Sequence, residues 1–250
     1  MIRQLSPYEK THLQRFGRSD IDINDYGEMP IEYITGKVEF GGHIFEINHD
    51  VLIPRVESGE LINLALQEIL PADKKKLNLA DIGCGCGAIG ISLWLELQKR
   101  GIEAELYLSD VSRKALSVAQ KNVATLIGKS DKIHILQSDL LTNYPQNIKF
   151  IILVANLPYI PSDRIRVLDE CVKEYEPHLA LNGGSDGLKY IKKLVDQAKK
   201  KLNLKGRILL EVDYTHDEEF LRNNLNLGEF KLKTSRDQFQ RTRFATISKN

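Results

Sequence analysis

Short apolar runs alternate with amphipathic segments along most of the chain. Apolar side chains recur at helical spacing in five segments, residues 57–70, 88–100, 113–126, 188–202 and 218–225. Runs of strand length occupy residues 77–82, 104–108, 132–136, 150–155 and 207–212. Strands separated by helix-length segments form right-handed crossovers, which predicts an α/β fold with a mostly parallel sheet and helices on both faces. Two further runs, residues 230–234 and 243–247, have no helix between them and predict an antiparallel end to this seven-stranded sheet.

The N-terminal part has a different pattern. A short polar helix is predicted at residues 6–15, followed by a stretch rich in Gly, Asp, Asn and Pro. Residues 36–49 alternate in polarity around Gly41 and Gly42, which indicates a β-hairpin. We therefore expect a helical appendage at residues 1–30, a hairpin linker at 31–55 and one α/β domain at 56–250.

Composition argues against a nucleic-acid-binding protein, a membrane protein and a metal-binding protein. The chain has 250 residues, 42% hydrophobic, with 35 Lys and Arg against 34 Asp and Glu. This balance argues against a nucleic-acid partner that would need a basic surface. No apolar run approaches the about 20 residues of a membrane span, so we expect a cytoplasmic protein without a membrane partner. The sequence does not determine the oligomeric state, and a monomer is the default expectation. Cys84, Cys86 and Cys171 lack paired spacing and the histidines are scattered, so no metal site is predicted.

A glycine-rich turn follows the first strand of the predicted domain. Residues 79–88 read LADIGCGCGA, with Gly83, Gly85 and Gly87 between the strand and the next helix. Glycine lets the backbone turn sharply and lets a ligand lie against main-chain N–H groups. We interpret Cys84 and Cys86 as small side chains tolerated between the glycines; the alternative is a reactive pair.

Three acids follow three successive strands. Asp81 ends the first strand, Asp110 ends the second and Asp139 follows the third. A carboxylate about 20 residues past a glycine turn is suited to ribose hydroxyls, and we assign this role to Asp110. Asp139 could take an adenine amine and Asp81 a cationic amino acid, so the three together fit S-adenosylmethionine. The glycines also satisfy a nicotinamide-dinucleotide pattern, but Asp81 would repel a pyrophosphate; an ordinary capped turn is the third interpretation.

A second polar motif follows the fourth strand: Asn156, Leu157, Pro158 and Tyr159. A planar NH₂ group is a weak nucleophile, and an Asn oxygen with a backbone carbonyl can accept both of its hydrogens. Tyr159 offers a flat face for stacking, and Pro158 stiffens the loop. Such positioning favours in-line methyl transfer without a metal. The alternative is a simple loop exit in which Asn156 caps a turn.

At these residues the sequence resembles class I S-adenosylmethionine-dependent methyltransferases, with a Rossmann-like fold. More narrowly it resembles the release factor glutamine methyltransferase family, through residues 33–40, 52–58, 176–181 and 183–188. The resemblance implies methyl transfer to the Gln of the Gly-Gly-Gln loop of a peptide chain release factor. It also implies that Asn156 and the carbonyl of residue 157 hold the amide, that Tyr159 stacks on it, and that the cofactor contacts Arg55, Gly83, Cys84, Gly85, Cys86, Gly87, Asp110 and Leu140. The two other acids, Asp81 and Asp139, and the acceptor residue Asn156 complete the expected cofactor site.

The sequence departs from the family in three places. Leu157 replaces a proline, an exchange that is tolerable if only the carbonyl matters, and Val56 and Gly59 replace a proline and an acid. Only about 30 residues precede the match, where the family usually has a longer helical domain. Two other functions stay open: an adenine methyltransferase acting on RNA or DNA, supported by basic residues at 199–201 and 236–243, and a catalytically silent cofactor-binding module.

Overall fold

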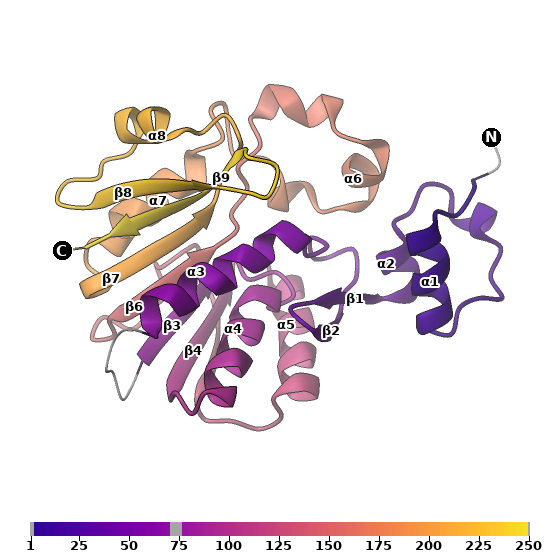
Figure 1. Cartoon of the computed structure of the whole chain (residues 1–250), viewed down its shortest axis with the longest axis horizontal. Coiled ribbons are helices and arrows are strands. Elements are labelled where there is room, and N and C mark those ends of the chain that lie inside the picture. Colours follow the sequence, from indigo (N-terminus) through magenta and orange to yellow (C-terminus); the bar gives the residue numbers. More distant parts are fainter. Residues whose placement is uncertain (1–2, 71–76, 250) are drawn as a thin grey trace.

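The computed structural model describes residues 3–70 and 77–249. Within these ranges the chain forms a seven-stranded sheet of order β5-β4-β3-β6-β7-β9-β8 and a separate two-stranded hairpin (Figure 1). Strands β5, β4, β3, β6 and β7 run parallel, whereas β9 is antiparallel to both β7 and β8. The predicted sheet, mostly parallel with an antiparallel C-terminal end, is confirmed.

The strands of the sheet lie close to their predicted positions. In chain order they are β3 (Leu77–Ile82), β4 (Ala104–Asp110), β5 (Ile133–Gln137), β6 (Phe150–Ala155), β7 (Leu202–Glu211), β8 (Lys231–Arg236) and β9 (Thr242–Ser248). Strand β6 is buried along its whole length, as expected for a central strand covered on both faces. The carboxyl end of β6 therefore lies at the middle of the edge where the parallel strands end.

Helices cover both faces of the sheet. One face carries α3 (Glu60–Ile69), α4 (Ala88–Lys99) and α5 (Arg113–Leu126), and the other carries α7 (Lys189–Ala198) and α8 (Glu218–Asn224) (Figure 1). Each face has its own apolar cluster: Leu77 and Leu79 of β3 pack in one, and Ala80 and Ile82 in the other. No helix of the described ranges is both long and apolar enough to cross a membrane.

Strand β7 begins earlier than predicted. Leu202, expected as the end of a helix, pairs with Phe150 of β6 and is buried. The register then shifts before Ile152 pairs with Arg207, and Lys205 adopts a left-handed φ of 61° within the irregular stretch. Pairing with a buried central strand thus overrides a local sequence that looks like a helix end followed by a turn.

The N-terminal residues form a small unit beside the sheet (Figure 1). Helix α1 (Pro7–Arg15) begins with a capping box between Ser6 and Glu9. A helix that the sequence did not predict, α2 (Ile31–Thr35), shares a small buried cluster with α1 and with a 3₁₀ turn, η1 (Ile23–Tyr26). The predicted hairpin follows as β1 (Lys37–Phe40) and β2 (His43–Glu46), and the structure thus groups residues 31–35 with the helices that precede them.

Short helical turns surround the carboxyl edge of the sheet. A 3₁₀ turn, η2 (Val56–Gly59), leads into α3. Between β6 and α7 the chain forms η3 (Ser162–Val167), α6 (Glu170–Tyr175) and η4 (His178–Ala180). The sequence analysis predicted none of these turns as separate elements, because each is too short to show a period.

Candidate active site

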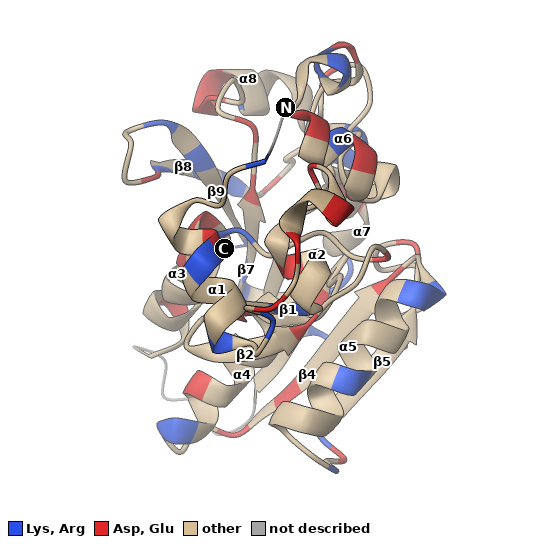
Figure 2. Ribbon diagram, turned by 90° about the vertical axis from the view of Figure 1, so that its right-hand side faces the viewer, with Lys and Arg blue, Asp and Glu red and all other residues tan. Residues whose placement is uncertain are grey.

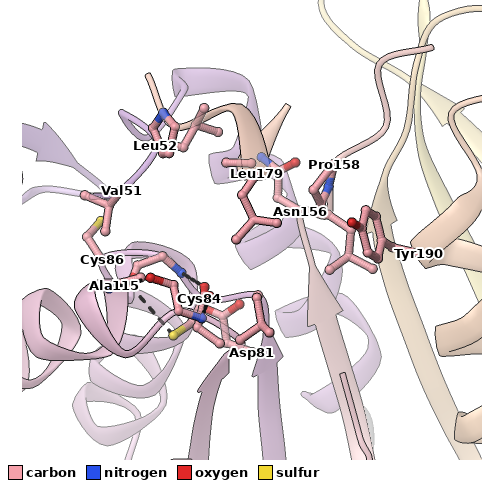
Figure 3. A pocket seen from close by; sticks show the side chains of 18 of the residues that line it. Val51, Leu52, Asp81, Cys84, Cys86, Ala115, Asn156, Pro158, Leu179 and Tyr190 are labelled. Carbon is pink, nitrogen blue, oxygen red and sulfur yellow. Dashed lines mark hydrogen bonds between the residues drawn. The ribbon is translucent and has the colours of Figure 1, made fainter. Parts of the chain in front are cut away.

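A cavity of about 450 Å³ opens at the carboxyl ends of the parallel strands. In Figure 3, Asp81, Cys84, Cys86 and Ala115 lie on one side of it, and Asn156, Pro158 and Tyr190 lie on the other. In open α/β sheets, ligands bind at this edge because neighbouring connections leave in opposite directions there. The size is that of a pocket for a small-molecule cofactor, about 300–1,000 Å³.

Four polar residues that the sequence singled out follow the order of the strands. Asp139, Asp110, Asp81 and Asn156 come after or at the ends of β5, β4, β3 and β6, which are neighbours in this order. All four line the cavity. The glycine-loop residues Gly83 to Cys86 line it too, as do Leu140, Leu157 and Pro158.

Asp81 is the most deeply buried of these acids, with 1% of its surface exposed. Its Oδ2 accepts a hydrogen bond of 2.8 Å from the backbone N–H of Gly90 in α4. Burial raises the pKa of Asp81 to about 7, and the negative charge of Asp110 adds to the effect, while the Gly90 hydrogen bond opposes it. A cation entering the cavity would therefore meet a carboxyl group that ionises readily in its presence.

Asp110 closes the glycine loop against the next strand. Its Oδ2 accepts from the backbone N–H of Gly85 at 3.0 Å, and its Oδ1 accepts from that of Ser112 at 2.9 Å. Burial raises the pKa of Asp110, opposed by these backbone hydrogen bonds. Each carboxylate oxygen has a second lone pair, so the side chain can still accept from a ligand hydroxyl.

The glycine loop leaves room for a ligand at its centre. Gly85 has a φ of 55°, and a Cβ built there would meet nothing within 4 Å, which places it at open space. Helix α4 starts directly after the loop. Its N-cap residue, Gly87, has no side chain to cap it, and Asp81 accepts from the N–H of Gly90 in the first turn, so the N–H groups that a ligand can meet are those before Gly90. Those groups are suited to an anionic group of a ligand. Burial raises the pKa of both Cys84 and Cys86, which favours the interpretation that these thiols are unreactive.

The edge of the cavity at β5 carries Asp139 and Leu140. Asp139 is exposed and pairs with Lys193 of α7. Leu140 is buried and has a φ of 55°, a left-handed conformation that is uncommon for a leucine. Backbone strain of this kind is often found next to ligand sites.

Asn156 is held from behind by a chain of hydrogen bonds. Its Nδ2 donates to Oγ of Ser58 at 3.0 Å, and Ser58 donates to Oε2 of Glu211 at 2.6 Å. The other oxygen of Glu211 accepts from the hydroxyl of Tyr159 at 2.8 Å, and Arg243 donates to that hydroxyl at 3.3 Å. Burial raises the pKa of Glu211, opposed by Ser58, Tyr159 and Arg243. Among the described residues, Oδ1 of Asn156 has no hydrogen-bond partner.

Three residues of the sequence prediction do not line the cavity. Gly87 supports the loop from beneath, where a Cβ would come within 2.8 Å of Ile91. The hydroxyl of Tyr159 donates to Oε1 of Glu211. Arg55 pairs with Glu176 at 2.5 Å and donates to the carbonyl of Ile53 at 3.1 Å. This ion pair joins two segments that line the cavity, residues 50–54 and 177–180, which we call the roof.

Sequence reasoning missed several residues of the site. Ser58 lies in a segment used for the resemblance, but nothing in its local pattern set it apart. Glu211 could have been found, because it is an acid at the carboxyl end of an apolar strand, like Asp81 and Asp110. Gly90 shows no signal within a helical pattern, although its N–H holds Asp81. The cavity wall formed by Lys189, Tyr190 and Lys193 was also missed.

Solved structures of low sequence identity share the fold. A ribosomal protein methylase of Lactobacillus delbrueckii has a TM-score of 0.53 at 21% identity and covers 78% of this chain and 80% of its own. The 16S rRNA methyltransferase RsmC of T. thermophilus, solved with AdoMet and guanosine, has a TM-score of 0.57 at 16% identity and covers 86% and 50%. The fold is that of class I methyltransferases.

Sequence comparison is more specific. The methyltransferase small domain family matches residues 62–185. The release factor glutamine methyltransferase of Leptospira interrogans is 34% identical over 88% of this chain and 75% of its own length. That of Clostridium acetobutylicum is 36% identical over 84% and 72%. With this similarity and with the cavity at the carboxyl ends of β3 to β6, the chain belongs to the release factor glutamine methyltransferase family.

Proposed function

We propose that this protein transfers a methyl group from S-adenosylmethionine to the side-chain amide nitrogen of the Gln in the Gly-Gly-Gln loop of a peptide chain release factor. The observation that carries the proposal is the placement of Asn156, with its Nδ2 on Ser58 and its Oδ1 unpartnered among the described residues, at the wall of the cavity beside Asp81. The names of the relatives support the substrate.

The cavity suits S-adenosylmethionine. Asp110 would accept hydrogen bonds from the ribose hydroxyls, and Asp139 with Leu140 would bind the adenine. The amino-acid end, which carries an ammonium and a carboxylate, would lie near Asp81 and the N–H groups that precede Gly90 at the start of α4. The open space beside Gly85 admits the ligand against the loop backbone. When bound, the cofactor supplies a methyl group on a positively charged sulfur.

The acceptor amide would be held by two oxygens of the chain. The Oδ1 of Asn156 accepts one N–H and the main-chain carbonyl of Leu157 accepts the other, which aims the nitrogen lone pair at the methyl carbon. The new N–C bond forms as the C–S bond breaks, its electron pair stays on sulfur, and the nitrogen releases one proton to solvent. The stacking of the acceptor on Tyr159 and the contact between Arg55 and the cofactor stay predictions. In the structure the hydroxyl of Tyr159 donates to Glu211, and Arg55 pairs with Glu176 at the roof.

The observations on charge do not favour a nucleic-acid substrate. Lys199 pairs with Asp196, and Lys201 donates to the carbonyls of Tyr144 and Pro145. These lysines precede the amino end of β7, opposite the edge that holds the cavity. On the side shown in Figure 2, basic and acidic residues are interspersed over the helices. A substrate that acts on the ribosome would place the enzyme in the cytoplasm, and we propose that it acts as a monomer.

Methyl transfer to a purified release factor tests the proposal. The protein is incubated with isotopically labelled S-adenosylmethionine, and the Gly-Gly-Gln peptide is analysed by mass spectrometry. We expect one methyl group on the Gln and none when that Gln is replaced by alanine. Cofactor binding without any transfer to the release factor would overturn the substrate, and ribosomal RNA and DNA are then the substrates to compare.

Substitution of Asn156 tests the assigned acceptor group and the silent-module alternative. Asn156→Ala should lower kcat by about 100-fold or more, because two hydrogen bonds to the reacting group are better than one at fixing its direction. Its affinity for the cofactor should change little. Asn63→Ala, on the exposed face of α3, is the matched control and should leave kcat unchanged. Equal rates for the two variants would remove Asn156 from the mechanism.

A further inference from the structure

Ser58 and Glu211 come from segments that are far apart in the sequence, yet they meet beside Asn156, where Ser58 also lines the cavity and Glu211 does not. Ser58 lies in η2, 98 residues from Asn156 and 153 residues from Glu211. Both residues are only 2% exposed. A buried carboxylate is costly to desolvate, so the presence of Glu211 next to a residue that lines the cavity points to a role beyond packing.

The donor and the acceptor of each hydrogen bond among Asn156, Ser58, Glu211 and Tyr159 are fixed by their chemistry. Both oxygens of Glu211 act as acceptors, one for Ser58 and one for Tyr159. The single hydroxyl hydrogen of Ser58 is therefore used on Glu211, and its oxygen is free to accept. The only polar group of Asn156 that can donate to it is the NH₂, which is the contact the structure shows.

The direction has a consequence for the amide of Asn156. An Asn side chain can turn over, exchanging its oxygen and nitrogen with almost no change in shape. In the turned orientation, the NH₂ of Asn156 would face the NH₂ of the substrate, which needs oxygens to accept its own two hydrogens. The Oδ1 of Asn156 would then face the oxygen lone pairs of Ser58. Only the observed orientation presents an oxygen to the cavity.

We propose that Ser58 and Glu211 are positioning residues that fix the amide orientation of Asn156, and so select an NH₂ group as the methyl acceptor. This inference rests on the proposed function for its catalytic consequence. Arg243 supports the arrangement, because it donates to Tyr159 and its charge favours the ionised form of Glu211. The two residues act through Asn156 and need no contact with the reacting atoms.

Two pairs of variants separate positioning from packing. Ser58→Ala removes the acceptor for Asn156, whereas Ser58→Thr keeps the hydroxyl. Glu211→Leu removes the group that sets the direction, whereas Glu211→Gln keeps one oxygen for Ser58. We expect kcat to fall about 10- to 100-fold in Ser58→Ala and in Glu211→Leu, with less than a threefold change in the Kd of S-adenosylmethionine, and most of the activity to return in the Thr and Gln variants.

The double variant Ser58→Ala/Glu211→Leu adds a further readout. Because both residues act on the same amide, the double variant should lose no more kcat than the worse single variant. Ser92→Ala is the matched control, since Ser92 is a buried serine of α4 whose Oγ has no partner among the described residues. Ser92→Ala should keep the wild-type kcat.

A measurement without substrate distinguishes failure of this inference from failure of the proposed function. In protein labelled with ¹⁵N-asparagine, the NH₂ signals of Asn156 are identified by their loss in Asn156→Ala. We expect slow hydrogen exchange at this NH₂ in wild type and in Ser58→Thr, and faster exchange in Ser58→Ala. Unchanged exchange and an unchanged kcat in Ser58→Ala would overturn the inference. Wild-type protein that protects this NH₂ but methylates no release factor would instead overturn the substrate.

Discussion

The backbone of Gly90 and the side chain of Asp81 approach too closely to admit a methyl group between them. The N–H of Gly90 donates to Oδ2 of Asp81 at 2.8 Å, and a Cβ built on Gly90 would stand 2.8 Å from the Cβ of Asp81 and 2.7 Å from a methyl of Leu108. Helix α4 therefore seats directly on the end of β3. The distance between α4 and the end of β3 thus sets the position of the Asp81 carboxylate at the cavity.

Gly90→Ala should consequently weaken both the fold and the site. The added methyl must push α4 away from β3, and we expect a net loss of about 1–2 kcal/mol in the free energy of unfolding, after the helix propensity gained by alanine. The Kd for S-adenosylmethionine should rise. Gly59→Ala is the matched control: a Cβ there meets nothing within 4 Å, and its φ of −60° suits alanine. Denaturant unfolding and calorimetry would measure both effects, and a fully stable Gly90→Ala would contradict the close seating.

The raised pKa of Asp81 predicts that the cofactor stabilises the protein more as pH rises. In the free protein the pKa is about 7, above the ordinary value of 3.8, so the folded state holds a proton that the unfolded state has lost between these pH values. The contribution of Asp81 to stability is therefore highest below pH 4 and declines as pH rises to about 7. A bound ammonium group would compensate the carboxylate charge.

Thermal unfolding with and without S-adenosylmethionine checks this sign. The increase in Tm that the cofactor causes should be larger at pH 8 than at pH 6, and Asp81→Asn should remove most of the difference. A cofactor-induced shift in Tm that is the same at both pH values in the wild type would show that Asp81 does not titrate with binding.

Leu157 should contribute through packing and through its carbonyl separately. Its side chain is 4% exposed and would lie 3.0 Å from a Cβ on Gly83. Leu157→Ala should cost about 2 kcal/mol of stability, at the low end for buried leucines because the side chain borders an open cavity. Since the backbone carbonyl remains, kcat measured below the Tm of the variant should stay within about threefold of the wild type. A loss as large as that of Asn156→Ala would mean that the side chain itself guides the acceptor.

The cysteines should differ in their reaction with iodoacetamide. Burial raises the pKa of all three thiols, but Cys84 and Cys86 are buried, whereas Cys171 in α6 is half-buried and can be reached by the reagent. At pH 7.5 we expect Cys171 to be alkylated first, as followed by peptide mass spectrometry. Modification of Cys84 before Cys171 would contradict an inert glycine loop.

Much of the site could be predicted because parallel strands end at one edge of the sheet. Asp81, Asp110, Asp139 and Asn156 each follow an apolar run, so their meeting depends only on the order of the strands. Ser58 could not be found in this way, since it reaches the site through the packing of η2 and α3 against β7, a contact between distant parts of the chain. The long β7 was missed for a similar reason, because its first residues are ordered by pairing with β6.

Arg55, which we expect to contact the cofactor, is paired with Glu176 in the roof. Its partner Glu176 is 3% exposed, and burial raises the pKa of Glu176 while Arg55 opposes the rise. A sequence places a charged residue near a motif, but the direction of its side chain depends on which partner is buried beside it. Its expected contact with the cofactor stays a prediction.

The order of the strands also sets the distances between the polar residues of the site. Five polar residues lie at or just after the carboxyl ends of five neighbouring strands, each strand about 4.8 Å from the next: Asp139, Asp110, Asp81, Asn156 and Glu211. The spacing between the group that would hold the methyl donor and the group that would hold its acceptor is thus a property of the backbone hydrogen bonds. Loops above the edge can change to admit a different acceptor chain while this spacing is preserved.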